Sequence, residues 1–168
     1  LAEHAPTHLI RVERPGRTGT GDYLSMRGES VREWNAPLDA LFLVAPRRVI
    51  TVGVGDGGNE IGMGALRARL ARAGPRIKKL ASVVSARYPV VAGVSNWGAY
   101  GIVVELSRLA RRPLLHTGDE ERRMIEACVK AGAVDGITRK HEATVDALPV
   151  EAHVGMVELL RLMENPSS

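Results

Sequence analysis

A glycine-rich segment constrains the fold of this chain more than any other feature. Six glycines stand among the twelve residues from Gly53 to Gly64, directly after the β-branched run 48–52. A short run of this kind bounded by glycine predicts a buried strand that passes into a tight turn. Apolar residues at helical spacing over about 60–72, followed by glycine and proline, predict a helix after the turn.

The alternation of strand and helix continues along the chain. This order favours a mainly parallel sheet with helices on both faces, a Rossmann-like three-layer α/β fold. Ligands of such sheets bind at the carboxyl ends of the strands, where the glycine-rich turn falls. Further strands are predicted at 8–12, 80–85, 90–95, 113–116 and 134–137, and further helices between Pro37 and Pro46, at 99–110, from a cap at Thr117 or Asp119 to Gly132, and around 154–161.

Length and composition fit one domain. With 168 residues and 45% hydrophobic content the chain can build its own core, so residues 1–168 are predicted to form a single domain. It has no run near the roughly 18 apolar residues of a membrane span, so we expect a soluble protein without a membrane partner. Because it begins at Leu1 without a signal or transit sequence, it resembles a fragment of a longer chain.

The charges are interleaved rather than clustered. The 23 basic and 19 acidic residues leave a net charge of +4, which suits an anionic substrate or residence in an alkaline compartment. A nucleic-acid groove would need clustered Lys and Arg with stacking aromatic rings, so no nucleic-acid partner is expected. The five histidines lack the local spacing of a zinc site. Cys128 lies among apolar residues and is predicted to be buried, and the charged run 120–123 is predicted to be a solvated helix face.

The glycine-rich turn also carries the strongest candidate site. Asp56, Asn59 and Glu60 lie within it and could bind an ammonium group, orient water, ligate a hard cation or exchange protons. The backbone N–H groups of such a turn can hold a carboxylate or a phosphate, and this makes Gly55, Gly57 and Gly58 candidate substrate-binding residues. The alternative is that Asp56 or Asn59 only caps the following helix.

A nucleotide site is the competing interpretation of the same glycines. Gly53, Gly55 and Gly58 match the spacing of a dinucleotide fingerprint after a strand. However, Asp56 and Glu60 would repel a pyrophosphate, and no Lys-Ser/Thr pair of a P-loop follows. We therefore expect no nucleotide cofactor.

Two further clusters could complete the site. Ser95, Asn96 and Trp97 follow a predicted strand, where they could donate, accept and form a pocket wall, or serve only as a cap and core packing. Arg17 and Arg27 lie in a glycine-rich loop, and either could hold a carboxylate in a two-pronged contact or remain a solvated surface charge.

Long sequence motifs resemble one known family. The segments GVGDGGNEIGMG at 53–64 and AGVSNWGAYG at 92–101 are similar to the two signature segments of the D-glutamate cyclase C-terminal domain. The segments ERPGR at 13–17 and VDALP at 145–149 are also similar, so the resemblance covers nearly the whole chain. It implies a lyase that interconverts D-glutamate and 5-oxo-D-proline plus water. In animal relatives it further implies a mitochondrial matrix protein with a larger N-terminal domain, whereas a bacterial relative would be cytoplasmic.

The reaction suggests roles for the candidate residues. We expect Asp56 or Glu60 to take the ammonium proton, and the Asn59 amide with the backbone of 57–59 to stabilise the oxyanion. Arg17 or Arg27 would then fix the α-carboxylate. A divalent cation held by Asp56 and Glu60 is an alternative with equal physical support. The competing class of protein is a non-catalytic module that binds a nucleotide or an amino acid.

Overall fold

The computed structural model describes residues 3–164. The chain divides into two compact units on either side of the bond between Gly98 and Ala99. Each unit is described by itself below. The prediction of one domain over 1–168 stays a prediction beside this division.

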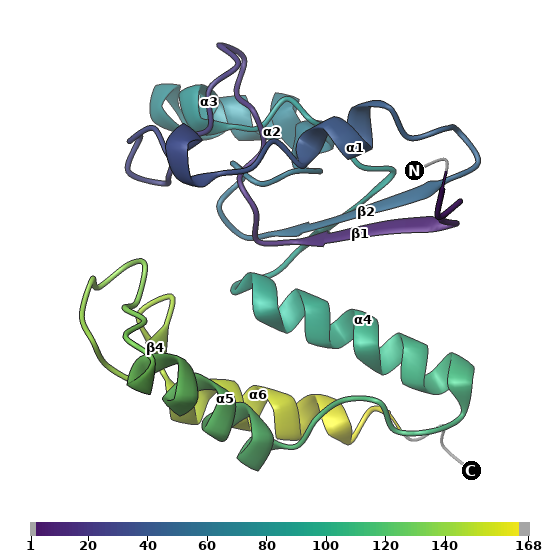
Figure 1. Cartoon of the computed structure of the whole chain (residues 1–168), viewed down its shortest axis with the longest axis vertical. Helices are drawn as coiled ribbons and strands as arrows, with labels where there is room; N and C mark the ends of the chain where they lie inside the picture. Colours follow the sequence, from purple (N-terminus) through teal and green to yellow (C-terminus); the bar gives the residue numbers. More distant parts are fainter. Residues whose placement is uncertain (1–2, 165–168) are drawn as a thin grey trace. The chain divides into compact units, whose positions relative to one another are not determined.

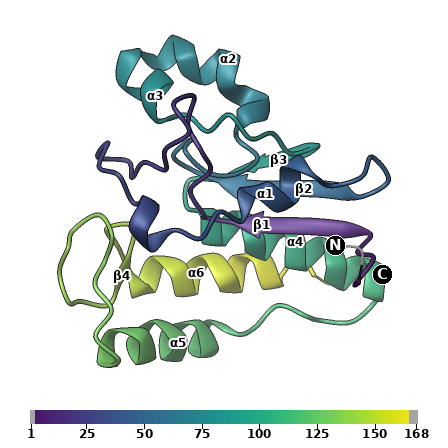
Figure 2. The ribbon, with the colours of Figure 1, turned by 45° about the horizontal axis from the view of Figure 1, so that its top comes forward.

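Unit 1 is built on a three-stranded parallel sheet. Strands β1 (His8–Val12), β2 (Ile50–Gly55) and β3 (Tyr88–Val91) lie in the order β1-β2-β3. Figure 1 shows β1 beside β2, and Figure 2 labels all three strands. The register places Arg11 of β1 beside Gly53 of β2, and Gly53 beside Pro89 of β3. With helices around it, this sheet confirms the predicted α/β Rossmann-like fold.

Short helices accompany the sheet of unit 1. Both ribbon views place α2 and α3 on the same side of it (Figures 1 and 2). Buried Val54, Ile61, Met63, Leu80 and Val84 contribute to the core of this unit. The helical elements are η1 (Arg32–Trp34), α1 (Asp39–Leu43), η2 (Gly64–Leu66), α2 (Arg67–Leu70), η3 (Ala71–Ala73) and α3 (Pro75–Leu80). The predicted helix between the two prolines is thus confirmed as α1.

The continuous helix predicted at 60–72 is wrong. Only short turns form there, and they begin at Gly64. The preceding residues form a turn, in which the N–H of Met63 donates to the Glu60 carbonyl. Gly62 has a φ of +100° and approaches Gly53 so closely that a Cβ on it would lie 2.7 Å from the Gly53 Cα. Glycine is required at both positions, since any side chain would drive the two backbones apart.

The strand predicted at 80–85 is also wrong. Leu80 ends α3, and the following residues run beside 62–64 rather than joining the main sheet. The carbonyl oxygen of Val84 accepts hydrogen bonds from the N–H groups of Gly62 (2.8 Å) and Gly64 (3.0 Å). This segment therefore hydrogen-bonds to a loop and forms no strand.

Unit 2 is mainly helical. Helix α4 (Ser95–Ala110) begins in unit 1 and continues into unit 2, where α5 (Gly118–Lys130) packs against α6 (Val150–Arg161). A two-stranded antiparallel hairpin, β4 (Thr144–Val145) with β5 (Leu148–Pro149), precedes α6 (Figure 2). Val104, Leu115 and Val157 form the buried core of this unit.

Two strands predicted in unit 2 do not form, because side-chain carboxylates accept hydrogen bonds from backbone N–H groups of these segments. The segment 113–116 is not a strand, because the N–H groups of Leu114 and Leu115 donate to the Glu164 carboxylate. The segment 134–137 is not a strand either, because buried Asp135 accepts from the N–H groups of Ile137 and Thr138. A backbone group that is satisfied by a side chain has no need of a ladder partner.

Three predictions in unit 2 concern the cap of α5 and the burial of Cys128 and Glu121. Thr117, the first of the two predicted caps, caps α5, and it does so in a capping box with Glu120. Cys128 is exposed rather than buried. Glu121 is not solvated but 2% exposed, because it accepts hydrogen bonds from Tyr100 and His116 at 2.7 Å each.

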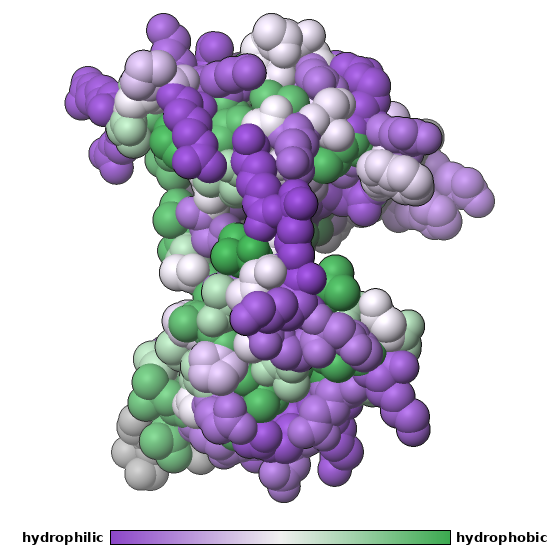
Figure 3. All heavy atoms as spheres, turned by 90° about the vertical axis from the view of Figure 1, so that its left-hand side faces the viewer, coloured by the Kyte–Doolittle hydropathy of each residue, from purple (hydrophilic) through white to green (hydrophobic). Residues whose placement is uncertain are grey.

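Polar and apolar residues mix on the surface. Hydrophilic residues spread over the face of each unit that Figure 3 shows, with hydrophobic residues between them. Among residues 3–164, no helix is long and apolar enough to cross a membrane.

Candidate functional site

The site lies where the three parallel strands of unit 1 end. Glu13 directly follows β1, Asp56 directly follows β2, and Ser95 lies four residues after β3. The N–H of Glu13 donates to the Val54 carbonyl (3.2 Å), which ties the end of β1 to β2. Carboxyl ends of parallel strands meet at one edge, so three polar side chains come together there.

Asp56 joins the end of β2 to the start of α4. Its Oδ2 accepts hydrogen bonds from the Ser95 N–H (2.8 Å) and the Ser95 hydroxyl (2.9 Å). The residue is exposed, whereas Ser95 is completely buried. A carboxylate at the first turn of a helix is stabilised by free N–H groups and by the helix dipole. The carboxylate is therefore held in one orientation while it remains open to solvent.

Glu60 organises the glycine-rich turn. Its side chain is 1% exposed and folds back over the turn, where Oε1 accepts from the N–H groups of Asp56 (3.1 Å) and Gly57 (2.7 Å). Oε2 accepts from the N–H of Gly58 at 2.7 Å. Close packing completes the arrangement, because a Cβ on Gly55 would lie 2.7 Å from the Glu60 carboxylate. Three donors stabilise this buried charge.

The groups expected to stabilise an oxyanion already have partners. The N–H groups of Gly57 and Gly58 donate to Glu60, so neither a phosphate nor an oxyanion meets free donors there. Buried Asn59 donates through Nδ2 to the Leu24 carbonyl (2.8 Å). In this arrangement Asn59 and Glu60 shape the turn, and Asp56 is the member of the trio that faces solvent.

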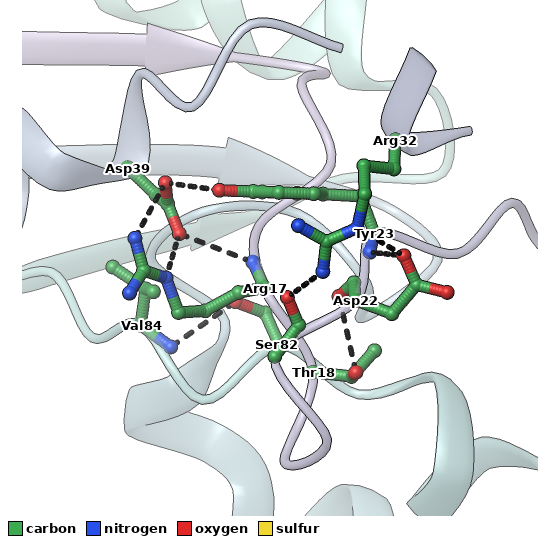
Figure 4. A network of polar contacts seen from close by, with 9 residues as sticks. Arg17, Thr18, Asp22, Tyr23, Arg32, Asp39, Ser82 and Val84 are labelled. Atoms are coloured by element: carbon green, nitrogen blue, oxygen red, sulfur yellow. Dashed lines mark hydrogen bonds and ion pairs between the residues drawn. The ribbon is translucent and has the colours of Figure 1, made fainter. Parts of the chain in front are cut away.

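Arg17 is engaged in a second network. Its guanidinium grips the buried carboxylate of Asp39, with Nε 2.6 Å from Oδ2, and the Tyr23 hydroxyl donates to Oδ1 at 2.7 Å (Figure 4). Burial acts to raise the pKa of Asp39, but hydrogen bonds from Arg17 and Tyr23 outweigh it and lower that pKa. The hydrogen bond to Asp39 raises the pKa of Arg17. This guanidinium is therefore part of the scaffold.

The remaining predicted residues occupy less informative positions. Arg27 is exposed, and its N–H donates to the Ser25 hydroxyl at 3.2 Å. Asn96 and Trp97 are half-buried in the first turn of α4, beside Ser95. Their roles in substrate binding stay predictions.

Sequence reasoning missed Glu13. One oxygen atom from each of Glu13, Asp56 and Glu60 lies within 4.8 Å of the others. Three carboxylates at this separation could hold a divalent cation, which extends the predicted pair by one residue. Glu13 could have been found by applying the strand-end rule to β1 as well as to β2.

A groove opens next to these carboxylates. It has a volume of about 380 Å³, and its lining comes from the end of β1, the loop that follows and the region of η1. This size falls within the range of small-molecule sites. Its lining residues are Val12, Glu13, Arg14, Pro15, Val31, Trp34 and Asn35. Glu13 belongs to both the groove and the carboxylate cluster.

A parallel sheet with polar groups gathered at its carboxyl edge defines an α/β domain of the kind that binds small ligands. Residues 2–161 match the family described as D-glutamate cyclase-like, C-terminal, and the chain belongs to that family. It is 40% identical over 101 residues to "D-glutamate cyclase, mitochondrial" of Homo sapiens. This match covers 59% of the chain and 16% of the human protein.

Proposed function

We propose that this domain catalyses the interconversion of D-glutamate and 5-oxo-D-proline plus water. Membership of the family and the partial match to the human enzyme support the proposal. The chemistry needs a base for the ammonium group, an electrophilic γ-carboxyl carbon and an acid for the departing oxygen. The carboxyl edge of the sheet in unit 1 supplies acidic groups at the location where ligands of such folds bind.

The orientation of Asp56 is the observation that carries this proposal. One of its oxygens is fixed by Ser95, and Oδ1 has no hydrogen bond to any of the residues 3–164. A fixed, solvent-facing carboxylate with one free oxygen is suited to receive a proton from a bound ammonium group. Buried Glu60, whose two oxygens accept three N–H groups, supports Asp56 by fixing the turn.

The proposed steps balance in atoms and charge. Asp56 removes a proton from the ammonium group of D-glutamate, and the neutral amine forms a C–N bond to the γ-carboxyl carbon. The proton on Asp56 and the second amine proton then pass to one carboxyl oxygen, the C–O bond breaks, and water leaves. The reverse sequence opens the lactam. A divalent cation at Glu13, Asp56 and Glu60 would polarise the γ-carboxyl group, and this remains part of the proposal.

Chiral chromatography tests the proposal directly. The chain is incubated with each enantiomer of glutamate and of 5-oxoproline, with and without added divalent cations. Interconversion of the D forms alone, lost in Asp56→Asn, is the expected result. Absence of turnover both in this chain and in a longer protein that includes the expected N-terminal domain would contradict the proposal. Tight nucleotide binding without any effect of D-glutamate would instead favour a non-catalytic binding module.

Two wider statements also belong to the proposal. We propose that the domain works as part of a longer chain, as the 16% coverage of the human protein suggests. We further propose a mitochondrial location, which rests on the name of that relative. Immunofluorescence of the tagged longer protein tests the location.

A further inference from the structure

The groove beside β1 contains hydrogen-bond donors that have no partner among residues 3–164. The Nδ2 of Asn35 and the Nε of Arg14 are both fully buried atoms of this kind. Asn35 as a whole is only 8% exposed. A buried donor without an acceptor costs free energy. Both donors belong to residues that line one groove, so they point to an acceptor that they meet when their side chains turn toward the groove.

A third group adds positive charge nearby. Arg11 on β1 is 7% exposed, and none of its three guanidinium nitrogens has a hydrogen-bond partner among the described residues. Its charge interacts with those of Arg14, Glu13 and Glu60. Buried guanidinium groups are normally paired with an anion. The acceptor that this region lacks is therefore anionic.

We propose that the groove binds the α-carboxylate of the substrate through Arg14 and Asn35, with Arg11 reinforcing the positive potential. This rests on the proposed function and assigns the carboxylate-binding role to Arg14 in place of Arg17, which grips Asp39. The α-carboxylate is the negative group that D-glutamate and 5-oxo-D-proline share, so one binding site serves both directions of the reaction.

Acidic residues next to the groove place hydrogen-bond acceptors beside its donors. Glu13 lines the groove and has a carboxylate oxygen within 4.8 Å of one from Asp56. An α-amino acid carries its ammonium and carboxylate groups on one carbon, so it needs donors and acceptors side by side, as Arg14 and Glu13 provide. The exposed ring of Trp34 and the side chain of Val31 offer an apolar wall for the methylene groups. Glu13 would disfavour a doubly charged phosphate.

Calorimetric titration of the 168-residue chain tests this assignment independently of turnover. The probes are 5-oxo-D-proline, D-glutamate and 4-aminobutyrate, which is glutamate without its α-carboxylate, together with inorganic phosphate. We expect 4-aminobutyrate to bind at least about 10-fold more weakly than D-glutamate, which is the value of one charged hydrogen bond. Phosphate binding more tightly than 5-oxo-D-proline would contradict a carboxylate site.

Two substitutions sharpen the test. Arg14→Gln and Asn35→Asp should each weaken 5-oxo-D-proline and D-glutamate by about 10- to 100-fold, while 4-aminobutyrate is unaffected by Arg14→Gln. Arg47→Gln is the matched control, because Arg47 is exposed and lies outside the groove lining. Wild-type affinity for 5-oxo-D-proline in both variants, equal loss of all probes in Arg14→Gln, or no binding by the parent chain would overturn the inference.

The outcomes separate this inference from the proposed function. Binding that depends on Arg14, with no turnover in this chain or in the longer protein, would support the groove and contradict the catalytic proposal. Turnover with an unchanged KM in Arg14→Gln would retain the catalytic proposal and refute the groove.

Discussion

Asp56 accepts two hydrogen bonds from Ser95 through one carboxylate oxygen, at 2.8 and 2.9 Å, and thereby links the end of β2 to the first turn of α4. This arrangement fixes the carboxylate without burying it. The same residue therefore serves as a helix-capping group and, in our proposal, as the proton acceptor. Substitutions can separate these two functions.

Asp56→Asn should abolish most turnover while it retains the fold. The amide oxygen can still accept from Ser95, so we expect a loss of stability of no more than about 1 kcal/mol. The amide cannot take a proton, and the loss of general base catalysis should lower kcat about 100-fold or more. Ser95→Ala is the companion variant, which keeps the base but loses one donor. Near-normal kcat in Asp56→Asn, measured by chiral chromatography, would refute the assigned role.

Glu60→Gln should act on stability as well as on activity. The neutral amide loses one acceptor oxygen and places an NH2 group against backbone donors, so three N–H groups no longer share a carboxylate. We expect a loss of about 1–3 kcal/mol. The measurement is urea unfolding, with exposed Glu33→Gln as the control. An unchanged unfolding midpoint for Glu60→Gln would show that Glu60 does not organise the turn.

The parts of the fold that could be predicted are those whose interacting residues lie close together in the sequence. The cap at Thr117 was predictable, because both partners of its capping box lie within three residues. The continuous helix at 60–72 failed because Gly62 packs on Gly53, nine positions away, in a contact that only the folded chain creates. Likewise Glu121 belongs to a charged run, yet it is buried by Tyr100 and His116.

The candidate site shows the same dependence. Asp56 was predictable because a strand and a glycine-rich turn precede it directly. Arg14 and Asn35 were not, since their significance lies in buried donors that lack partners in the fold. Arg17 was chosen as a carboxylate-binding residue from its loop position, but its carboxylate is Asp39, 22 residues away.

Asp39→Asn should destabilise the protein strongly. Asp39 is completely buried, and it accepts from Arg17 and Tyr23 in an arrangement that a neutral amide reproduces poorly. Removal of one partner from a fully buried ion pair costs about 3–5 kcal/mol of stability. Because Arg17 is one-third exposed, we expect a loss below that range for Asp39→Asn. Thermal unfolding of Asp39→Asn and of the control Asp119→Asn, at an exposed position, measures the effect. A similar Tm for both variants would contradict it.

Asp135 should contribute a pH-dependent part of the stability of unit 2. Burial acts to raise its pKa, but hydrogen bonds from Thr138, Ala147, Thr144 and Ile137 lower it to about 2. The lowered pKa means that the stabilisation is complete above the pKa of an unfolded aspartate, near 3.9, and is lost as the pH falls toward about 2. The expected contribution is about 2 kcal/mol.

The Asp135 prediction is checked by acid unfolding of the parent chain and of Asp135→Asn. Between about pH 4 and 7 the variant should be less stable by a constant amount, and the difference should shrink as the pH falls toward about 2. A difference that does not change over this range would show that the carboxylate charge is not responsible.

Arg11→Met should raise stability while it weakens the ligand. Burial and the charge of Arg14 lower the pKa of Arg11 to about 10, although the charges of Glu13 and Glu60 act to raise it, so the charged form is penalised in the folded protein. Replacing it with an apolar side chain of similar length should stabilise the free protein by about 1–3 kcal/mol. Because a lowered pKa of a base penalises the folded state below that pKa, the advantage of the variant should shrink as the pH rises through about 10. Urea unfolding from about pH 8 to 11 measures this, and calorimetry should show weaker binding of 5-oxo-D-proline. A variant that is less stable than the parent chain, or that binds as tightly, would show that Arg11 already has its anion within the fold.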